Sequence, residues 1–241
     1  MTSAFGPPPA RAGGTCSGID PSNRDSSCLA EDDLSELPTS VWSRSLERFR
    51  QDTAANRPTP GCGAVAAVSA SLGLALVLKA LRISQTRQED PRRLRLIEPV
   101  ETLLKRLGSF ADDDMQAFSR YLQAARQSDD TSGDDVQAAA RQACAVPLAT
   151  AHACLEALGL SVSALSLAVD VVRADIEAGA LLIHSALSAA LLNVDADLPC
   201  LAGHDSREQA RAMRQRLQAD ADAALQRLRG GASRGRGMTS R

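Results

Sequence analysis

The stretch PTPGCGAVAAVSASLGLALVLKALRIS, residues 58–84, decides the fold because a Pro/Gly turn leads directly into a long run of small and aliphatic residues. Pro58 and Pro60 cannot lie inside a helix, whereas Gly61 and Gly63 permit a tight turn and leave the backbone uncovered. We therefore predict a helix that starts beside bare glycine backbone, with N–H groups available to an anion or a carbonyl oxygen. The same pattern also fits a plain loop-to-helix connection.

The overall composition favours a helical protein without a nucleic-acid partner. Lys and Arg total 27 against 29 for Asp and Glu, a formal charge of −2, so neither nucleic acid nor an anionic membrane is an expected partner. Hydrophobic residues reach 44% although aromatic residues are only 2%, so Ala, Leu and Val must form the core. Such side chains suit helix–helix packing and make poor stacking platforms for bases.

The cysteines and histidines follow no metal-binding spacing. None of the six cysteines forms a CxxC pair, and the three histidines fit neither an HExxH nor a Cys/His pattern. Cys144 and Cys154 lie in apolar stretches, where reduced, buried thiols are expected. We therefore expect no metal, no cofactor and a cytoplasmic protein. The uncharged run from Ala64 to Leu78 is shorter than the roughly 20 residues that span a bilayer, which favours a buried helix and no membrane partner.

Hydrophobic periodicity predicts an all-α fold, an antiparallel helical bundle with long helices rich in small residues. Residues 1–38 are expected to be a disordered leader and residues 230–241 a flexible basic tail, which leaves 39–229 as the folded domain. Pro99 and Pro147 are expected to kink or divide helices, and Gly159 to end one. The expected helices are 40–54, 63–85, 91–127, 133–158, 161–195 and 205–229.

Asp114 is the first candidate for chemistry. At 100° per residue it shares a helix face with Ala117, Phe118 and Tyr121, so its carboxylate loses hydration and its pKa should rise. Such a group suits proton transfer. The alternative is an acidic cluster at a helix N-terminus, which fits Asp112 and Asp113 better than Asp114.

A second polar pair, Asp175 and Asn193, lies along one stripe of small residues that another helix can approach closely. The two residues are about 27 Å apart if the helix is continuous, so they cannot touch the same reacting atom within one helix. One would serve the ligand and the other the scaffold, or they would complete sites from two subunits. His184 lies on the opposite face, and we interpret it as a core or interface residue.

Four motifs in order resemble the cyclodeaminase/cyclohydrolase family, which includes the C-terminal half of formiminotransferase-cyclodeaminase and the stand-alone methenyltetrahydrofolate cyclohydrolases. The family's Pro-Gly-Gly-Gly-Ser signature is matched by residues 60–64, and its Asp-x-x-Ala-Phe motif by residues 114–118. Its Ala-Val-Pro-Leu segment recurs at residues 145–148, and its Ser-Asp…Asn-Val ending at Ala174-Asp175…Asn193-Val194. The resemblance covers about residues 40–229.

The resemblance implies a helical homodimer, or a larger assembly of dimers, that acts on a small folate substrate in one-carbon metabolism. The favoured reaction is hydrolysis of 5,10-methenyltetrahydrofolate to 10-formyltetrahydrofolate, and formiminotetrahydrofolate cyclodeamination is the alternative. Asp114 would be the catalytic acid/base. The substrate-binding residues would be Thr59, Pro60, Gly61, Cys62, Gly63, Asp113, Asp175 and Asn193.

Several positions depart from the family pattern. Cys62 replaces the middle glycine, Ala64 replaces the serine, and Asp197 stands where asparagine is usual after Asn-Val. The altered loop is bulkier and lacks a hydroxyl group. A folate-binding or regulatory paralogue without turnover is therefore a second interpretation, and a helical scaffold unrelated to folate is a third.

Overall fold

The structure, a computed structural model, describes residues 40–127 and 133–236, and over these ranges it is helical without any strand. This confirms the predicted all-α class. The elements are η3 (Val41–Ser43), α1 (Leu46–Ala54), α2 (Cys62–Arg87), α3 (Pro91–Gln127), α4 (Asp134–Leu167), η4 (Asp170–Val172), α5 (Arg173–Asp197), η5 (Leu198–Cys200) and α6 (His204–Arg236).

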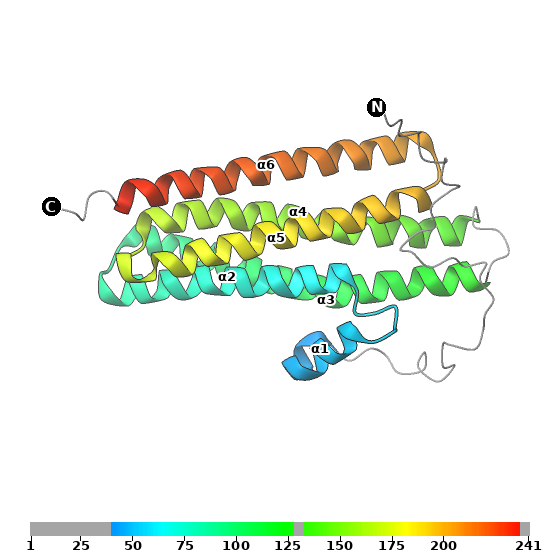
Figure 1. Ribbon diagram of the computed structural model, residues 1–241, viewed down its shortest axis with the longest axis horizontal. Coiled ribbons are helices and arrows are strands. Elements are labelled where there is room, and N and C mark those ends of the chain that lie inside the picture. Colours follow the sequence, from blue (N-terminus) through cyan, green and yellow to red (C-terminus); the bar gives the residue numbers. More distant parts are fainter. Residues whose placement is uncertain (1–39, 128–132, 237–241) are drawn as a thin grey trace, which may run out of the picture.

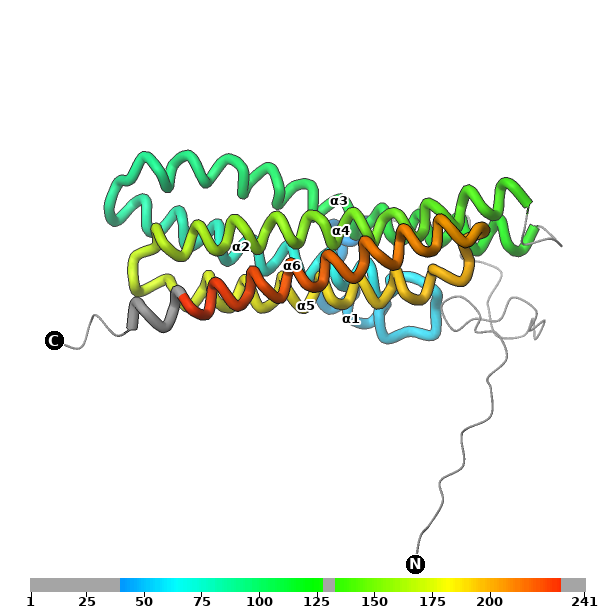
Figure 2. Tube along the Cα trace, turned by 90° about the horizontal axis from the view of Figure 1, so that it is seen from above, coloured from blue at the N-terminus to red at the C-terminus, as the bar shows by residue number. Residues whose placement is uncertain are grey.

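Helices α2 to α6 form an antiparallel bundle in which each long helix runs opposite to the one before it (Figure 1). Seen from above, α3 lies along one side and α5 and α6 along the other, with α2 and α4 between them (Figure 2). Helix α4 contacts all four other long helices, α2, α3, α5 and α6, whereas α2 contacts α3, α4 and α5. The short helix α1 lies beside the bundle and leads into the start of α2.

The core is built from aliphatic side chains, as the composition required. The largest buried cluster contains five large aliphatic side chains that are fully buried: Leu74, Leu107, Leu158, Ile183 and Leu187. Numerous alanines on the same faces fill the spaces between them, which allows the helices to approach closely.

The small-residue stripe of α5 packs against α2 inside the bundle, which is the close helix approach that the sequence predicted. A Cβ atom on Gly73 would lie 2.6 Å from the carbonyl oxygen of Gly179, so the α2 and α5 backbones touch at these two glycines. Gly179 is therefore a residue of the protomer core. A leucine at position 179 would force α2 and α5 apart.

The helix end predicted at Gly159 is wrong, because α4 continues through it to Leu167. Pro99 and Pro147 do not divide α3 and α4, which both remain single helices. Gly159 has open space around it and is tolerated in a helix at a cost of roughly 1 kcal/mol relative to alanine.

The actual break between α4 and α5 is held by side chains from elsewhere in the chain. The buried guanidinium group of Arg93 donates to the carbonyl oxygens of Leu167 and Ser84, which lie at the C-terminal ends of α4 and α2. The hydroxyl oxygen of Ser84 accepts a hydrogen bond from the backbone N–H of Val169 at 3.1 Å. These contacts satisfy carbonyl and N–H groups that a helix end leaves unpaired.

The predicted ends of the folded domain can be compared with the structure only where the structure describes them. The predicted leader, residues 1–38, lies outside the described residues, as does the final part of the predicted tail. Helix α6 continues to Arg236, so the backbone of residues 230–236 is helical and not a loose tail. The two glycines at 230 and 231 did not end the helix as the sequence suggested.

Three segments of the described chain are long and apolar enough to cross a membrane by length and composition alone: α2, α4 and the run Asp170–Cys200. The sequence argument from one short uncharged run was therefore too narrow. In the bundle these segments pack on one another, and 67% of the most apolar window of α2 is buried inside the protein. The absence of a membrane partner stays a prediction.

Candidate active site

The start of α2 is built around a carboxylate from another helix. The backbone N–H of Ala64, in the first turn of α2, donates a hydrogen bond to Asp114 of α3. A Cβ atom on Gly63 would overlap the Asp114 carboxylate, so only glycine fits at this position. The N-terminal N–H group that the sequence offered to a ligand is thus taken, at least at Ala64, by the protein's own Asp114.

The Asp114 carboxylate lies in a cleft of about 460 Å³ between the loop before α2, the middle of α3 and the end of α5. The lining residues from the predicted set are Thr59, Gly61, Cys62, Asp114 and Asn193. The Asn193 amide donates to Oδ1 of Asp114 at 3.5 Å. The structure therefore brings the Gly-rich loop, Asp114 and Asn193 together, as the sequence predicted.

Pro60 and Cys62 shape the loop in different ways. Pro60 is buried and is joined to Thr59 by a cis peptide bond. Cys62 is exposed, and its thiol donates to the carbonyl oxygen of Ala189 on α5 at 3.4 Å. The thiol side chain that replaces a glycine in the family signature thus links the loop to α5.

Burial determines how readily the Asp114 carboxyl group in the cleft loses its proton. Only 8% of Asp114 is exposed, and desolvation raises the pKa of its carboxyl group to about 6, against the opposing hydrogen bond from Ala64. A carboxylate with a pKa near 6 is ionised in part at neutral pH and can exchange protons there. This agrees with the shift expected from the apolar stripe of α3.

The cleft contains a second buried carboxyl group that the sequence reasoning did not count as a site residue. Asp197, the last residue of α5, is 6% exposed and lines the same cleft. Burial, and then the charge of Asp114, raise the pKa of Asp197 to about 7. Its position one helical turn after Asn193 was a usable signal, because residues four apart share a helix face.

Arg57, Pro58, Phe118, Ala143, Leu192 and Ala196 complete the lining of the cleft. Phe118 was on the predicted Asp114 face of α3, whereas Arg57 lies in the loop before α2 and carried no periodic signal. The sequence could not place Arg57, because a loop position depends on how the chain folds back onto the bundle.

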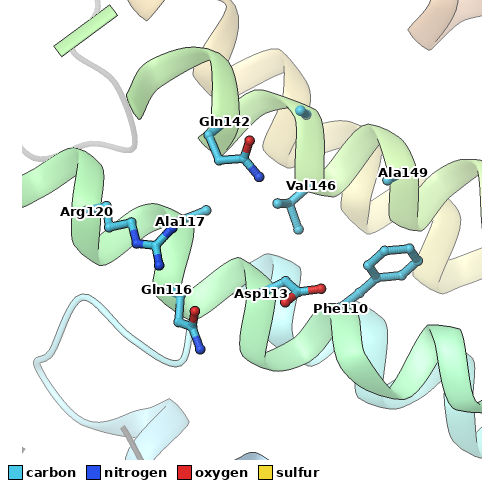
Figure 3. A pocket seen from close by; sticks show the side chains of 9 residues that line it. Phe110, Asp113, Gln116, Ala117, Arg120, Gln142, Val146 and Ala149 are labelled. Carbon is cyan, nitrogen blue, oxygen red and sulfur yellow. The ribbon is translucent and has the colours of Figure 1, made fainter. Parts of the chain in front are cut away.

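Asp113 is not in this cleft. It lines a separate, shallower pocket of about 320 Å³ between α3 and α4, together with Phe110, Arg120 and Gln142 among others (Figure 3). Burial and the neighbouring charge of Asp112 raise the pKa of Asp113. Successive residues on a helix point about 100° apart, so Asp113 and Asp114 face different pockets.

Asp175 also lies outside the cleft. Its carboxylate forms an ion pair with Lys79 of α2 at 2.9 Å, in the first turn of α5, whereas Asn193 is near the other end of that helix. His184 forms a 2.7 Å contact with Asp222 of α6, which fits its interpretation as a packing residue. Of the polar pair on α5, only Asn193 reaches Asp114.

Asp112 has a structural role. Its two carboxylate oxygens accept hydrogen bonds from the hydroxyl group of Ser40, at 2.6 Å, and from the backbone N–H of Val41, at 2.8 Å. These bonds fix η3 against α3. Asp112→Asn would therefore weaken the attachment of the N-terminal segment.

Among the described residues, no group of three His, Cys, Asp or Glu side chains is arranged to hold a metal ion. Cys144 and Cys154 are buried thiols, and burial raises the pKa of Cys154 to about 12. The cleft thus offers carboxyl groups, amides and one cation, a set suited to proton transfer and to binding a polar or cationic ligand.

Comparison with known proteins places this chain in a family. The family model described as formiminotransferase-cyclodeaminase matches residues 45–219. The chain belongs to this family, and the match includes every residue that lines the Asp114 cleft.

Two relatives and one solved structure are similar to the chain. It is 36% identical over 123 residues to formimidoyltransferase-cyclodeaminase of Sus scrofa, which covers 47% of this chain and 23% of that enzyme. It is 28% identical over 127 residues to methenyltetrahydrofolate cyclohydrolase of Methylorubrum extorquens, 48% of this chain and 61% of that enzyme. The chain thus spans only part of each relative.

The fold matches formiminotetrahydrofolate cyclodeaminase from Thermotoga maritima with a TM-score of 0.73, over 80% of this chain and 97% of that one. At 22% sequence identity this likeness shows the fold alone.

Proposed function

We propose that this protein is an enzyme of one-carbon tetrahydrofolate metabolism that hydrolyses 5,10-methenyltetrahydrofolate to 10-formyltetrahydrofolate. Its family, and relatives whose names include both a cyclodeaminase and a cyclohydrolase, support folate one-carbon metabolism as the setting. The choice of hydrolysis as the reaction is the proposal.

The observation that carries the proposal is the buried Asp114 carboxylate at the head of the cleft, with a pKa of about 6. Hydrolysis of a cationic methenyl ring needs a base that removes a proton from the attacking water. It also benefits from negative charge close to the ring. Asp114 meets both needs, and the N–H of Ala64 keeps the carboxylate oriented.

The substrate would lie along the loop of residues 59–62, with Asn193 as a further binding group. A cleft of about 460 Å³ is within the range of small-molecule sites, roughly 300–1,000 Å³. Arg57 supplies a guanidinium group at the same cleft, suited to a carboxylate of the ligand. We expect no cofactor besides the folate itself.

The direct test follows the absorbance of methenyltetrahydrofolate with purified protein. Loss of absorbance well above the spontaneous rate supports hydrolysis. Asp114→Asn should lower the enzymatic rate by roughly 10²–10⁴-fold while binding of the folate is retained. A wild-type protein that leaves the absorbance at the spontaneous rate would contradict the proposed reaction.

Formiminotetrahydrofolate cyclodeamination is the second candidate, favoured by the family model and by the 36% identical relative. It closes the same ring on a formimino carbon and expels ammonia, so the same base can serve. Release of ammonia from formiminotetrahydrofolate, together with appearance of methenyltetrahydrofolate absorbance, would establish this reaction in place of hydrolysis.

A protein that binds folate without turning it over is the outcome suggested by the altered loop, in which the Cys62 thiol bonds to α5. Saturable binding of a reduced folate with neither absorbance change nor ammonia release would show this. A scaffold unrelated to folate would show no binding at all.

We also propose a cytoplasmic homodimer that associates through the outer face of α2 and α5. Leu72 on α2 and Leu182 on α5 are 50% and 41% exposed, and Leu192, which is 62% exposed, lines the cleft. A second copy of the chain that packs on these leucines would remove their side chains from water and would cover the edge of the cleft at Leu192.

A further inference from the structure

The cleft contains a buried carboxyl group without a partner. Asp197 is 6% exposed, lines the cleft, and has no hydrogen-bond or ion-pair partner among the described residues. Burying a carboxylate without a compensating bond is costly, so the group is expected to be neutral.

The two carboxyl groups of the cleft differ in their position relative to the helix ends. Asp114 accepts the N–H of Ala64 in the first turn of α2, where the helix dipole is positive and stabilises an anion. Asp197 is the last residue of α5 and directly precedes η5, and its side chain accepts no capping hydrogen bond from η5. The N–H of Ala64 therefore favours the negative charge on Asp114, which leaves the proton on Asp197.

The pKa directions agree with this assignment. Burial raises the pKa of both carboxyl groups, to about 6 for Asp114. The charge of Asp114 raises the pKa of Asp197 further, to about 7. Two nearby carboxyl groups in one desolvated site share a proton because both cannot ionise at low cost. The pair therefore holds one proton below about pH 7 and loses it as the pH rises through that value.

Among the described residues, three other titratable groups face the pair: Cys62 on α2, Tyr121 on α3 and Cys144 on α4. Burial raises the pKa of each side chain, so all three are uncharged at pH 7. Arg57, in the loop before α2, supplies a positive charge at the cleft. Proton exchange near neutral pH is thus left to Asp114 and Asp197.

We propose that Asp197 is the general acid of this cleft: it holds a proton in the resting protein and gives it to the leaving amine, while Asp114 takes a proton from the attacking group. The chemical step rests on the proposed folate function. The protonated resting state of Asp197 does not.

The protons balance over the hydrolysis. The water oxygen bonds to the methenyl carbon as one O–H bond breaks, and that proton passes to Asp114. The bond from this carbon to N5 then breaks, its electron pair stays on N5, and N5 takes the proton of Asp197. As the formyl carbonyl forms, the remaining hydroxyl proton passes to Asp197. Asp114 then releases its proton to solvent, so one water is consumed and one proton leaves.

The first test needs no substrate. Asp197→Asn keeps the shape and removes the titration, and Asp195→Asn is the control, an exposed carboxylate on the same helix that pairs with Arg214 at 3.0 Å. A carboxyl pKa raised on folding contributes stability that is fully present below about pH 4 and is lost as pH rises through about 7. The Tm advantage of Asp197→Asn over wild type should therefore widen, by about 2 °C or more, between about pH 5 and about pH 8. The Tm of Asp195→Asn should follow wild type in parallel. Parallel curves for Asp197→Asn would overturn the proposal.

The second test addresses proton transfer. Asp197→Asn should lower kcat by roughly 100-fold, with KM changed little and the loss of rate at high pH removed from the pH profile. Wild-type turnover in this variant would overturn the role of Asp197 as acid. A wild type without turnover on either folate would overturn the proposed function and the transfer step together. The Tm measurement would still show whether Asp197 is protonated in the resting protein.

Discussion

Asp114 combines two roles that are usually separate: it caps a helix of the scaffold and presents a carboxylate to the cleft. The N–H of Ala64 and the amide of Asn193 both point to this carboxylate, so its orientation is fixed by two other helices. A base held in this way loses little entropy when the substrate binds. Gly63 makes the arrangement possible, because no side chain separates α2 from the carboxylate.

Asp114→Asn keeps the shape of the side chain and removes its basicity, so turnover should fall by roughly 10²–10⁴-fold. In wild type, turnover should rise as pH passes through about 6, because the base must lose its proton. The stability contribution of a raised carboxyl pKa is lost as pH rises through that pKa, so the variant should be at least as stable as wild type above pH 7. Steady-state kinetics and thermal unfolding across pH check both effects.

Asp113→Asn is the matched control for this experiment, since Asp113 is the adjacent carboxylate on α3 and lines the other pocket. Its turnover should stay close to wild type. A large loss in Asp113→Asn with normal turnover in Asp114→Asn would move the active site to the pocket of Figure 3.

Gly63→Ala should remove most of the activity, because the added methyl group would occupy the position of the Asp114 carboxylate. The side chain must turn away from Ala64, which misplaces the base, and a shift of about 1 Å can cost 100-fold in rate. Gly159→Ala is the control, the same substitution where a methyl group meets nothing. Equal activity in both variants would argue against this geometry.

At the scale of the elements, one buried arginine joins three helices. Arg93, in the first turn of α3, is 4% exposed and donates to carbonyl oxygens at the C-terminal ends of α2 and α4. Its positive charge suits the negative ends of both helix dipoles. This contact determines where α4 ends and where the chain turns towards α5.

Arg93→Met should lower the free energy of unfolding by about 2–4 kcal/mol, because it leaves buried carbonyl oxygens without a donor. Chemical denaturation measures this change. Arg95→Met removes an exposed guanidinium group two residues further along α3 and should change stability by less than about 0.5 kcal/mol. Similar losses in the two variants would contradict the assigned role of Arg93.

At the scale of the whole molecule, the bundle buries its small-residue stripe internally and exposes a leucine-bearing face of α2 and α5. If this face joins two copies, Leu72→Glu and Leu182→Glu should each shift the protein towards monomer, because a carboxylate in an apolar interface is left unpaired. Light scattering at micromolar concentration measures the shift. Leu94→Glu, at a position 60% exposed on α3, is the control and should leave the assembly unchanged. A wild type that is already monomeric would rule the dimer out.

Part of the site follows from local sequence. The period of α3 places Asp114 on an apolar face, and the Pro/Gly turn places the start of α2 beside uncovered backbone. Both inferences hold because they depend only on residues within a few turns of each other. The all-α class follows for the same reason, from helical periodicity repeated along the chain.

Other features depended on contacts between segments far apart in the sequence. Gly159 suggested a helix end, but α4 ends where Arg93 and Ser84 satisfy its backbone groups, 74 residues away for Arg93. Asp175 and Asn193 looked equivalent on one stripe of the helix. In the structure Asp175 forms an ion pair with Lys79, whereas the amide of Asn193 donates a hydrogen bond to Asp114. Local propensity cannot decide such cases, because their energy comes from a partner that only the folded chain supplies. The sequence by itself determined the helical class and the apolar helix face that carries Asp114. Only tertiary packing buried Asp197 against α3 and α4 in the same cleft, because its surroundings come from helices far away in the sequence.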